Sequence, residues 1–417
     1  MSEMVIHNVD LMLTMDGDES NCLGALEQAA LLVQNGRVVW VGPSALAPPA
    51  ELRIDGAGCV ALPGLVDCHT HAVWAGSRSD EFRRRLAGES YSAILEGGGG
   101  ILSTVNATRQ ATLNELVNLT TQRLKRLLAR GVTTVEVKSG YGLEPETELK
   151  MLHAAQLAGE RAGLRVLKTF LGAHAIPADF RARRQAYVAQ VIEEQLPLVA
   201  ELADFIDVYV DRGAFTLEEG RQVLQAGKER GLTPRIHAEQ VVHTGAAAMA
   251  AELGAISADH LEQIDDVGIS ALAANNTTAV LLPGAMLYLK DPPPPVEALR
   301  KARVPMAVAS DLNPGSSPVG DLWACASLGC VLMGLTVEEA LRGITCVAAA
   351  ALGRDDIGVL KVGNRADILL MQPPPGEPPT AASLVQYLGL AKAVVVVRDG
   401  RVLADNRPHR RGRLDTA

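Results

Sequence analysis

The sequence Leu62-Pro63-Gly64-Leu65-Val66-Asp67-Cys68-His69-Thr70-His71 is an apolar run that ends in two histidines. The run is prone to form a β-strand, and Pro63-Gly64 marks a turn at its start. Residues two apart on a strand share one face, so His69 and His71 project the same way from the strand end. Two imidazoles on one face begin a metal site without completing it. Because a bare pair of this kind also suits a polar loop, the interpretation depends on the rest of the chain.

The composition is that of a globular protein with room for more than one domain. The chain has 417 residues, of which 48% are hydrophobic and 21% are charged, and it can bury a large core. A net charge of −9 argues against a nucleic-acid-binding surface. We expect no membrane span, since no apolar run approaches about 20 residues, and no signal peptide. The six cysteines include no C-x-x-C pair, which predicts reduced thiols in a cytoplasmic protein.

Both ends of the chain are rich in hairpin signals, and the middle is not. Asn35-Gly36 separates two apolar runs near the N-terminus, and Asp399-Gly400 does the same near the C-terminus. Such dipeptides are typical of tight β-hairpin turns. We therefore predict a small β-sandwich domain formed by both termini, from residues 1–60 and 355–417, and a catalytic domain over residues 61–354.

The middle of the chain alternates between strand-like and helical segments. The strand-like runs cover residues 62–68, 132–138, 165–171, 205–210, 234–238, 256–260, 278–282 and 304–309. Eight parallel βα units that close on themselves form a (β/α)8 barrel. A doubly wound open sheet is the competing arrangement. The barrel is favoured because polar candidate residues follow many different strands instead of lining one crevice.

The strand ends, where barrel enzymes place their active sites, carry a set of metal-binding residues. His69 and His71 follow the first strand, His237 lies at the end of the fifth, and Asp311 follows the eighth. Three imidazoles and one carboxylate suit Zn²⁺ or an iron ion, with one position left for water. Such an ion lowers the pKa of its water to about 7 and supplies hydroxide at neutral pH. His260, after the sixth strand, is a possible fifth ligand, but we favour a neutral imidazole that orients the hydroxide or stabilises an oxyanion.

Several motifs resemble those of a known enzyme family. Residues 63–71 are similar to the opening motif of the amidohydrolase superfamily. Within it, four further segments resemble the imidazolonepropionase family of histidine degradation: Gly76-Ser77-Arg78 with Glu81-Phe82, Lys138 to Leu143, Leu171 to Ala175, and Ser310 to Ser316. The resemblance covers nearly the whole chain in the expected order. It implies metal-dependent hydrolysis of the cyclic amide C–N bond of 4-imidazolone-5-propanoate to N-formimino-L-glutamate.

The resemblance also implies how a small substrate with a carboxylate is held. Arg78 offers a planar fork that matches the propionate carboxylate, although a surface arginine in an Arg-rich segment is the alternative. The remaining implied substrate contacts are Tyr91, Tyr141, His174, Gln240, Asn313, Gly315 and Ser316. Tyr91 fits a core aromatic equally well.

The implied mechanism uses Asp311 to accept the proton of the attacking water and His260 to stabilise the tetrahedral anion. Binuclear relatives bridge two ions with a carboxylated lysine after the fourth strand, where this chain has Val210-Asp211, so we predict one ion. We expect a homodimer.

Two other functions compete with this hypothesis. The first is a deaminase or formimino-hydrolase of the same superfamily, many of which use a glutamate three residues after the fifth-strand histidine. This chain has Gln240 there, and an amide cannot act as a base. The second is a metal-free scaffold, which the retained ligand set argues against.

Overall fold

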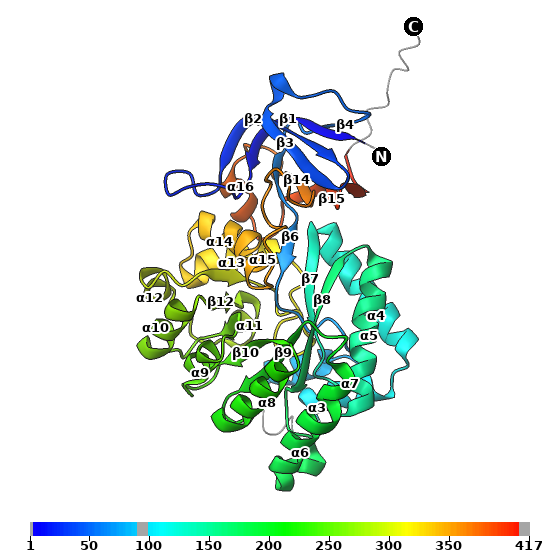
Figure 1. The fold of residues 1–417 in the computed structure, drawn as a ribbon, viewed down its shortest axis with the longest axis vertical. Coiled ribbons are helices and arrows are strands. Elements are labelled where there is room, and N and C mark those ends of the chain that lie inside the picture. The colour runs from blue at the N-terminus through cyan, green and yellow to red at the C-terminus, as the bar shows by residue number, and fades with distance from the viewer. Residues whose placement is uncertain (1–2, 90–98, 408–417) are drawn as a thin grey trace.

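Two eight-stranded sheets organise the chain, one in each of the two parts that Figure 1 shows. The computed structural model describes residues 3–89 and 99–407. The larger part holds a parallel sheet whose strands pair in chain order. These strands are β6 (Leu65–Asp67), β7 (Val132–Lys138), β8 (Arg165–Ala173), β9 (Phe205–Val210), β10 (Thr233–Ala238), β11 (Ser257–His260), β12 (Thr278–Leu281) and β13 (Met306–Val308). A parallel bridge between Thr70 and Leu312 joins the two ends of the sheet. The predicted (β/α)8 barrel is therefore confirmed as a nearly closed barrel.

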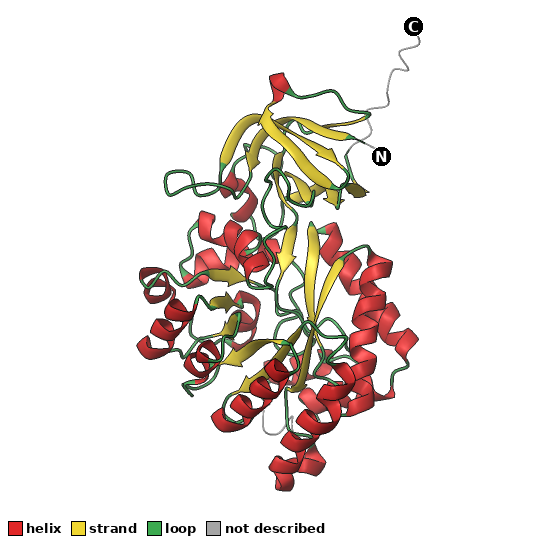
Figure 2. Cartoon of the chain, viewed as in Figure 1, coloured by secondary structure: helices red, strands yellow, loops and turns green. Residues whose placement is uncertain are grey.

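Helices lie around the outside of this sheet, as Figure 2 shows in red. They are α1 (Ser79–Leu86), α3 (Ile101–Gln110), α4 (Leu113–Ala129), α5 (Pro145–Ala162), α6 (Arg184–Gln190), α7 (Leu196–Val199), α8 (Leu217–Glu229), α9 (Ala246–Glu252), α10 (Asp266–Asn275), α11 (Pro283–Leu289), α12 (Val296–Lys301), α13 (Leu322–Met333), α14 (Val337–Gly343) and α15 (Cys346–Ala350). Within the described ranges, no helix is both long enough and apolar enough to cross a membrane.

Local sequence explains why these elements alternate. Every residue of β7 is buried, as expected for a parallel strand covered on both faces. The preceding helix, α4, begins at a capping box in which Thr112 and Glu115 each accept a hydrogen bond from the other's backbone N–H, which satisfies two free donors. Gly131, with φ +96°, then turns the chain from the helix into β7.

The second sheet is mixed and is built from both ends of the chain. Its strands pair in the order β16-β15-β14-β5-β1-β2-β3, and β4 pairs with β1. They are β1 (Met4–Leu13), β2 (Ala25–Gln34), β3 (Arg37–Pro43), β4 (Leu52–Asp55), β5 (Val60–Pro63), β14 (Ile368–Gln372), β15 (Lys392–Arg398) and β16 (Arg401–Asp405), with the short helix α16 (Ala381–Val385) between β14 and β15. Ile6, Leu31, Ile368 and Val395 belong to a buried cluster of its own.

The single strand predicted over residues 62–68 is instead divided between the two sheets at Gly64. β5 pairs with β14 in the terminal sheet, whereas β6 pairs with β7 in the barrel. The backbone N–H of Gly64 donates to Asp367 of the terminal part. A Cβ atom at Gly64 would lie 2.4 Å from Oγ1 of Thr133, so only glycine allows this close approach. The prediction missed the division because both halves are equally apolar.

Candidate active site

Three histidines meet at the carboxyl-terminal end of the barrel. His69 and His71 follow β6, and His237 lies near the end of β10. One ring nitrogen from each lies within 4.8 Å of the other two, and all three residues are buried. The Nε2 atoms of His71 and His237 are 3.3 Å apart. Together these side chains form a site that can hold a metal ion.

Asp311, which follows β13, the last barrel strand in chain order, lies beside these histidines. Its Oδ1 atom lies 3.5 Å from Nε2 of His69 and 3.5 Å from Nε2 of His71. The backbone N–H of Asp311 donates to the carbonyl of His69, which ties the end of the eighth strand to the end of the first. Asp311 also has φ +49°, a left-handed conformation that non-glycine residues rarely adopt outside functional sites and turns.

The donor set fits a metal ion. Two ligands roughly 2.0–2.1 Å from one ion at the tetrahedral angle lie about 3.4 Å apart, close to the 3.3 Å and 3.5 Å separations observed here. Nε2 of His69 is buried and has no hydrogen-bond partner in the described part of the chain. Burial lowers the pKa of His69, His71 and His237 well below the ordinary value, so their nitrogen lone pairs are available. Burial also raises the pKa of Asp311 to about 7.

Two buried aspartates orient the histidines from behind. Oδ2 of Asp259 lies 2.6 Å from Nδ1 of His69, and Oδ1 of Asp207 lies 3.1 Å from Nδ1 of His237. A carboxylate that accepts from Nδ1 leaves Nε2 free for a metal and fixes the ring plane. Sequence reasoning did not identify these residues. The available signal is a lone carboxylate within a strand: Asp207 stands between Ile206 and Val208, and Asp259 stands between Ala258 and His260.

A buried ion network supports the aspartates. Nζ of Lys138 lies 2.8 Å from Asp207 and 3.0 Å from Glu136, and Arg235 lies 3.2 Å from Asp259. Although burial lowers the pKa of Lys138, the charges of Asp207 and Glu136 raise it on balance. Lys138 is therefore held by carboxylates beneath the histidines.

Tyr141 and His174, two of the predicted substrate contacts, lie beside the histidines. The His174 ring stacks on His71, with centroids 5.0 Å apart and an interplanar angle of 14°. Tyr141 is buried, and its ring centroid lies 5.5 Å from that of His174. Nδ1 of His174 lies 2.9 Å from the carbonyl oxygen of Gly140, which fixes the ring. The rings of Tyr141 and His174 are inclined at 49° to each other and lie next to the metal-binding group.

Arg78 lies against the loop that follows Asp311. Its guanidinium pairs with Glu81 at 2.6 Å, and the Arg78 side chain is 13% exposed, which argues against the surface-arginine alternative. A Cβ atom added to Gly315 would lie 3.1 Å from Nη1 of Arg78, so two of the predicted substrate-binding residues are neighbours. Tyr91 lies outside the described residues.

Gln240 and Asn313 are already engaged with protein groups. Oε1 of Gln240 accepts a hydrogen bond from the hydroxyl of Tyr209 at 3.0 Å. Asn313 donates to the carbonyl of Asp311 and accepts from the N–H groups of Gly315 and Ser316. The Asn313 side chain therefore shapes the loop, and its contact with the substrate stays a prediction. Tyr209 was not among the predicted site residues.

His260 lies at the end of β11, close to the histidine group. Its ring centroid is 5.5 Å from that of His237 and 5.9 Å from that of His69. Burial lowers the pKa of His260, but Glu262, Asp311 and Asp259 raise it above the ordinary value on balance. The neighbouring carboxylates therefore favour the protonated imidazole, and the neutral form predicted from sequence stays a prediction.

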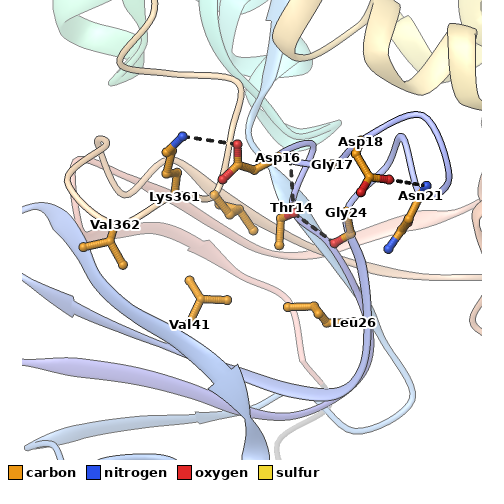
Figure 3. A pocket seen from close by; sticks show the side chains of 11 residues that line it. Thr14, Asp16, Gly17, Asp18, Asn21, Gly24, Leu26, Val41, Lys361 and Val362 are labelled. Carbon is orange, nitrogen blue, oxygen red and sulfur yellow. Dashed lines mark hydrogen bonds and ion pairs between the residues drawn. The ribbon is translucent and has the colours of Figure 1, made fainter.

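The pocket drawn in Figure 3 lies far from this chemistry, in the terminal domain. Thr14, Asp16, Asp18 and Asn21 line part of it, and Lys361 pairs with Asp16 at 3.3 Å. None of the predicted site residues lines this pocket.

Comparisons with known proteins agree with this geometry. Residues 60–403 match the amidohydrolase family. Imidazolonepropionase from Shewanella frigidimarina is 45% identical over 94% of this chain and 96% of its own length. Imidazolonepropionase from a Polaromonas species is 48% identical over 91% of this chain and 89% of its own length.

Solved structures with the same fold are more distant in sequence. A crystal structure of an adenosine deaminase from Xanthomonas campestris with bound zinc has a TM-score of 0.73 at 19% identity, covering 97% of this chain and 93% of its own. Atrazine chlorohydrolase from Arthrobacter aurescens, complexed with zinc, has a TM-score of 0.64 at 19% identity, covering 97% and 95%. At this identity the likeness establishes the fold alone.

Proposed function

The chain belongs to the amidohydrolase family and, within it, to the imidazolonepropionases, and from this premise we propose how its site works. The reaction is hydrolysis of the cyclic amide C–N bond of 4-imidazolone-5-propanoate to N-formimino-L-glutamate. The observation that carries the proposal is the cluster in which Asp311 lies 3.5 Å from both His69 and His71, and His71 lies 3.3 Å from His237. Arg78, Tyr141 and His174 are the proposed substrate contacts.

His69, His71, His237 and Asp311 would hold one metal ion, zinc in preference to iron. Three imidazoles and one carboxylate are a common donor set for a catalytic zinc ion. When bound, the ion lowers the pKa of a water ligand and polarises a carbonyl oxygen. Lys138 is paired with Asp207 and Glu136 and is not placed to bridge a second ion, which supports a mononuclear site.

The substrate is held at both ends. Arg78 binds the propionate carboxylate through its planar fork, sharing the guanidinium with Glu81. The ring of the substrate lies along Tyr141 and His174, whose flat faces suit a planar heterocycle. Gln240, held by Tyr209, supplies an amide for the polar edge of the ring.

The chain's own groups then move the proton. Asp311 accepts a proton from the attacking water, whose oxygen adds to the ring carbonyl carbon. His260 donates a hydrogen bond to the oxyanion that forms on the former carbonyl oxygen. As the C–N bond breaks, Asp311 returns its proton to the leaving ring nitrogen, so Gln240 need not act as a base.

The proposal is tested by mixing the purified protein with 4-imidazolone-5-propanoate and following the decay of its ultraviolet absorbance. Mass spectrometry should identify N-formimino-L-glutamate as the product, and an ammonia assay should stay at background. Release of ammonia in step with substrate loss would instead support the deaminase or formimino-hydrolase alternative.

We also propose that the enzyme is a cytoplasmic homodimer. All six cysteines are free, as expected for the cytoplasm. The proposed homodimer is tested by light scattering coupled to gel filtration, where a mass near that of one 44.0 kDa chain would contradict it.

A further inference from the structure

Glu262 is a buried carboxylate that the chemistry above does not use. Its side chain is 1% exposed. Neither carboxylate oxygen has a hydrogen-bond partner among residues 3–89 and 99–407. A buried carboxylate without a partner is unfavourable in a folded protein. Its presence at the carboxyl-terminal end of β11, beside the active site, points to a role in the reaction.

An unusual turn places Glu262 next to His260. His260 has φ +83° and Leu261 has φ +73°, two successive left-handed conformations that are costly for non-glycine residues. The turn is anchored to the neighbouring strand end, because the N–H of Leu261 donates to Ala238 and the N–H of Gln263 donates to Glu239. The strain therefore persists in a segment held firmly on the active-site side.

Nδ1 of His260 is a hydrogen-bonding group that could pair with Glu262. This atom is also buried without a hydrogen-bond partner within the described ranges. Oε2 of Glu262 lies 3.9 Å from this nitrogen, beyond the upper limit of about 3.2 Å for an N–H···O hydrogen bond. A small rotation of either side chain would bring the two atoms into contact.

We propose that Glu262 is a positioning residue that accepts the Nδ1–H of His260 during the reaction. The inference rests on the proposed function. When both ring nitrogens are protonated, the imidazole donates from Nε2 to the tetrahedral oxyanion and carries a second N–H on Nδ1. Glu262 is the acceptor for that N–H, so the 3.9 Å gap closes when the substrate fills the site. The hydrogen bond fixes the ring orientation and leaves Nε2 for the substrate.

The test replaces Glu262 with a side chain of similar size that cannot accept a hydrogen bond. Glu262→Met should lower kcat by about tenfold to a hundredfold, the effect typical of lost orienting partners, while KM changes by less than about threefold. Metal content should not change, since Glu262 contacts none of the proposed ligands. The melting temperature should stay the same or rise, because an unpartnered buried carboxylate is removed. A carboxylate with a purely structural role would give the opposite pattern.

A matched control comes from the same loop. Asp265 caps α10 through its side chain, and asparagine caps helices equally well. Asp265→Asn therefore removes one negative charge three residues away and should leave kcat unchanged. Glu262→Gln, which keeps a neutral acceptor, should fall between wild type and Glu262→Met. It also serves as the test variant if the methionine protein does not fold.

Nuclear magnetic resonance of protein labelled with ¹⁵N-histidine separates this proposal from the proposed function. With N-formimino-L-glutamate bound, the Nδ1–H of His260 should give a downfield proton signal that is absent in Glu262→Met and in His260→Gln. The proposal is overturned if Glu262→Met keeps kcat within about twofold of wild type, or if the signal survives the substitution. A wild-type protein that does not consume the substrate would refute the proposed function, whereas an active wild type whose kcat and resonance are unaffected by Glu262→Met would refute only the role of Glu262.

Discussion

Replacing Arg78 with alanine should weaken recognition of the substrate carboxylate by an amount that the structure constrains. A largely desolvated ion pair broken outright costs about 3–5 kcal/mol. Arg78, however, is already paired with Glu81 at 2.6 Å, so its guanidinium is not left unpaired without substrate. The substrate carboxylate therefore contributes only the binding free energy of hydrogen bonds to a charged group, about 1.5–3 kcal/mol. At about 1.4 kcal/mol per factor of ten, kcat/KM should fall by about tenfold to 150-fold.

The assay is the initial rate of absorbance decay at substrate concentrations well below KM, with metal content measured on the same samples. Arg83→Ala is the matched control, because Arg83 lies in the same Arg-rich segment but is 74% exposed and pairs with Asp80. It should retain wild-type kinetics. Discrimination against the ring without its propionate should shrink only in Arg78→Ala. Unchanged kinetics in Arg78→Ala, or equal losses in both variants, would refute carboxylate binding at Arg78.

Three further results are expected at the metal site. Alanine at His69, His71 or His237 should remove the metal and abolish turnover, whereas wild type should hold one ion per chain by elemental analysis; two ions at full occupancy would contradict the mononuclear site. Asp311→Asn, reloaded with metal, should lose about 10²–10⁴-fold in kcat, and near-normal kcat would exclude it as proton acceptor. Gln240→Ala should raise KM more than it lowers kcat, and a selective loss of kcat would assign it to proton transfer.

The barrel and the metal-binding residues were predictable because both depend on local sequence. Strand ends at regular spacing determine which side chains face the active site, and this places His69, His237 and Asp311 at one end of one barrel. The division at Gly64 was not predictable in the same way. Both halves of residues 62–68 are buried strand, and only the close approach of Thr133 and the hydrogen bond to Asp367 show that the sheet changes there.

The surroundings of the site depended on contacts between distant segments. Asp259 orients His69 across 190 positions of sequence, and no spacing rule connects the two residues. Arg78 pairs with Glu81 within one helical turn, but only the fold shows that its guanidinium also lies next to Gly315 in the loop after Asp311. In the sequence Glu262 resembles any ordinary charged residue, because only the fold shows that it is buried without a hydrogen-bond partner among the described residues.

The bond that is broken is tested most directly by a single turnover in water labelled with ¹⁸O. Attack on the ring carbonyl places the water oxygen in the carboxylate next to the nitrogen-bearing carbon of N-formimino-L-glutamate. The product should therefore carry one labelled oxygen at that position in mass spectrometric fragments, and no ammonia should be released. Label in a formyl group would show that water attacks the carbon between the two nitrogens, and an unlabelled carboxylate would show that its new oxygen does not come from water. Either result, or release of ammonia, would contradict hydrolysis of the cyclic amide.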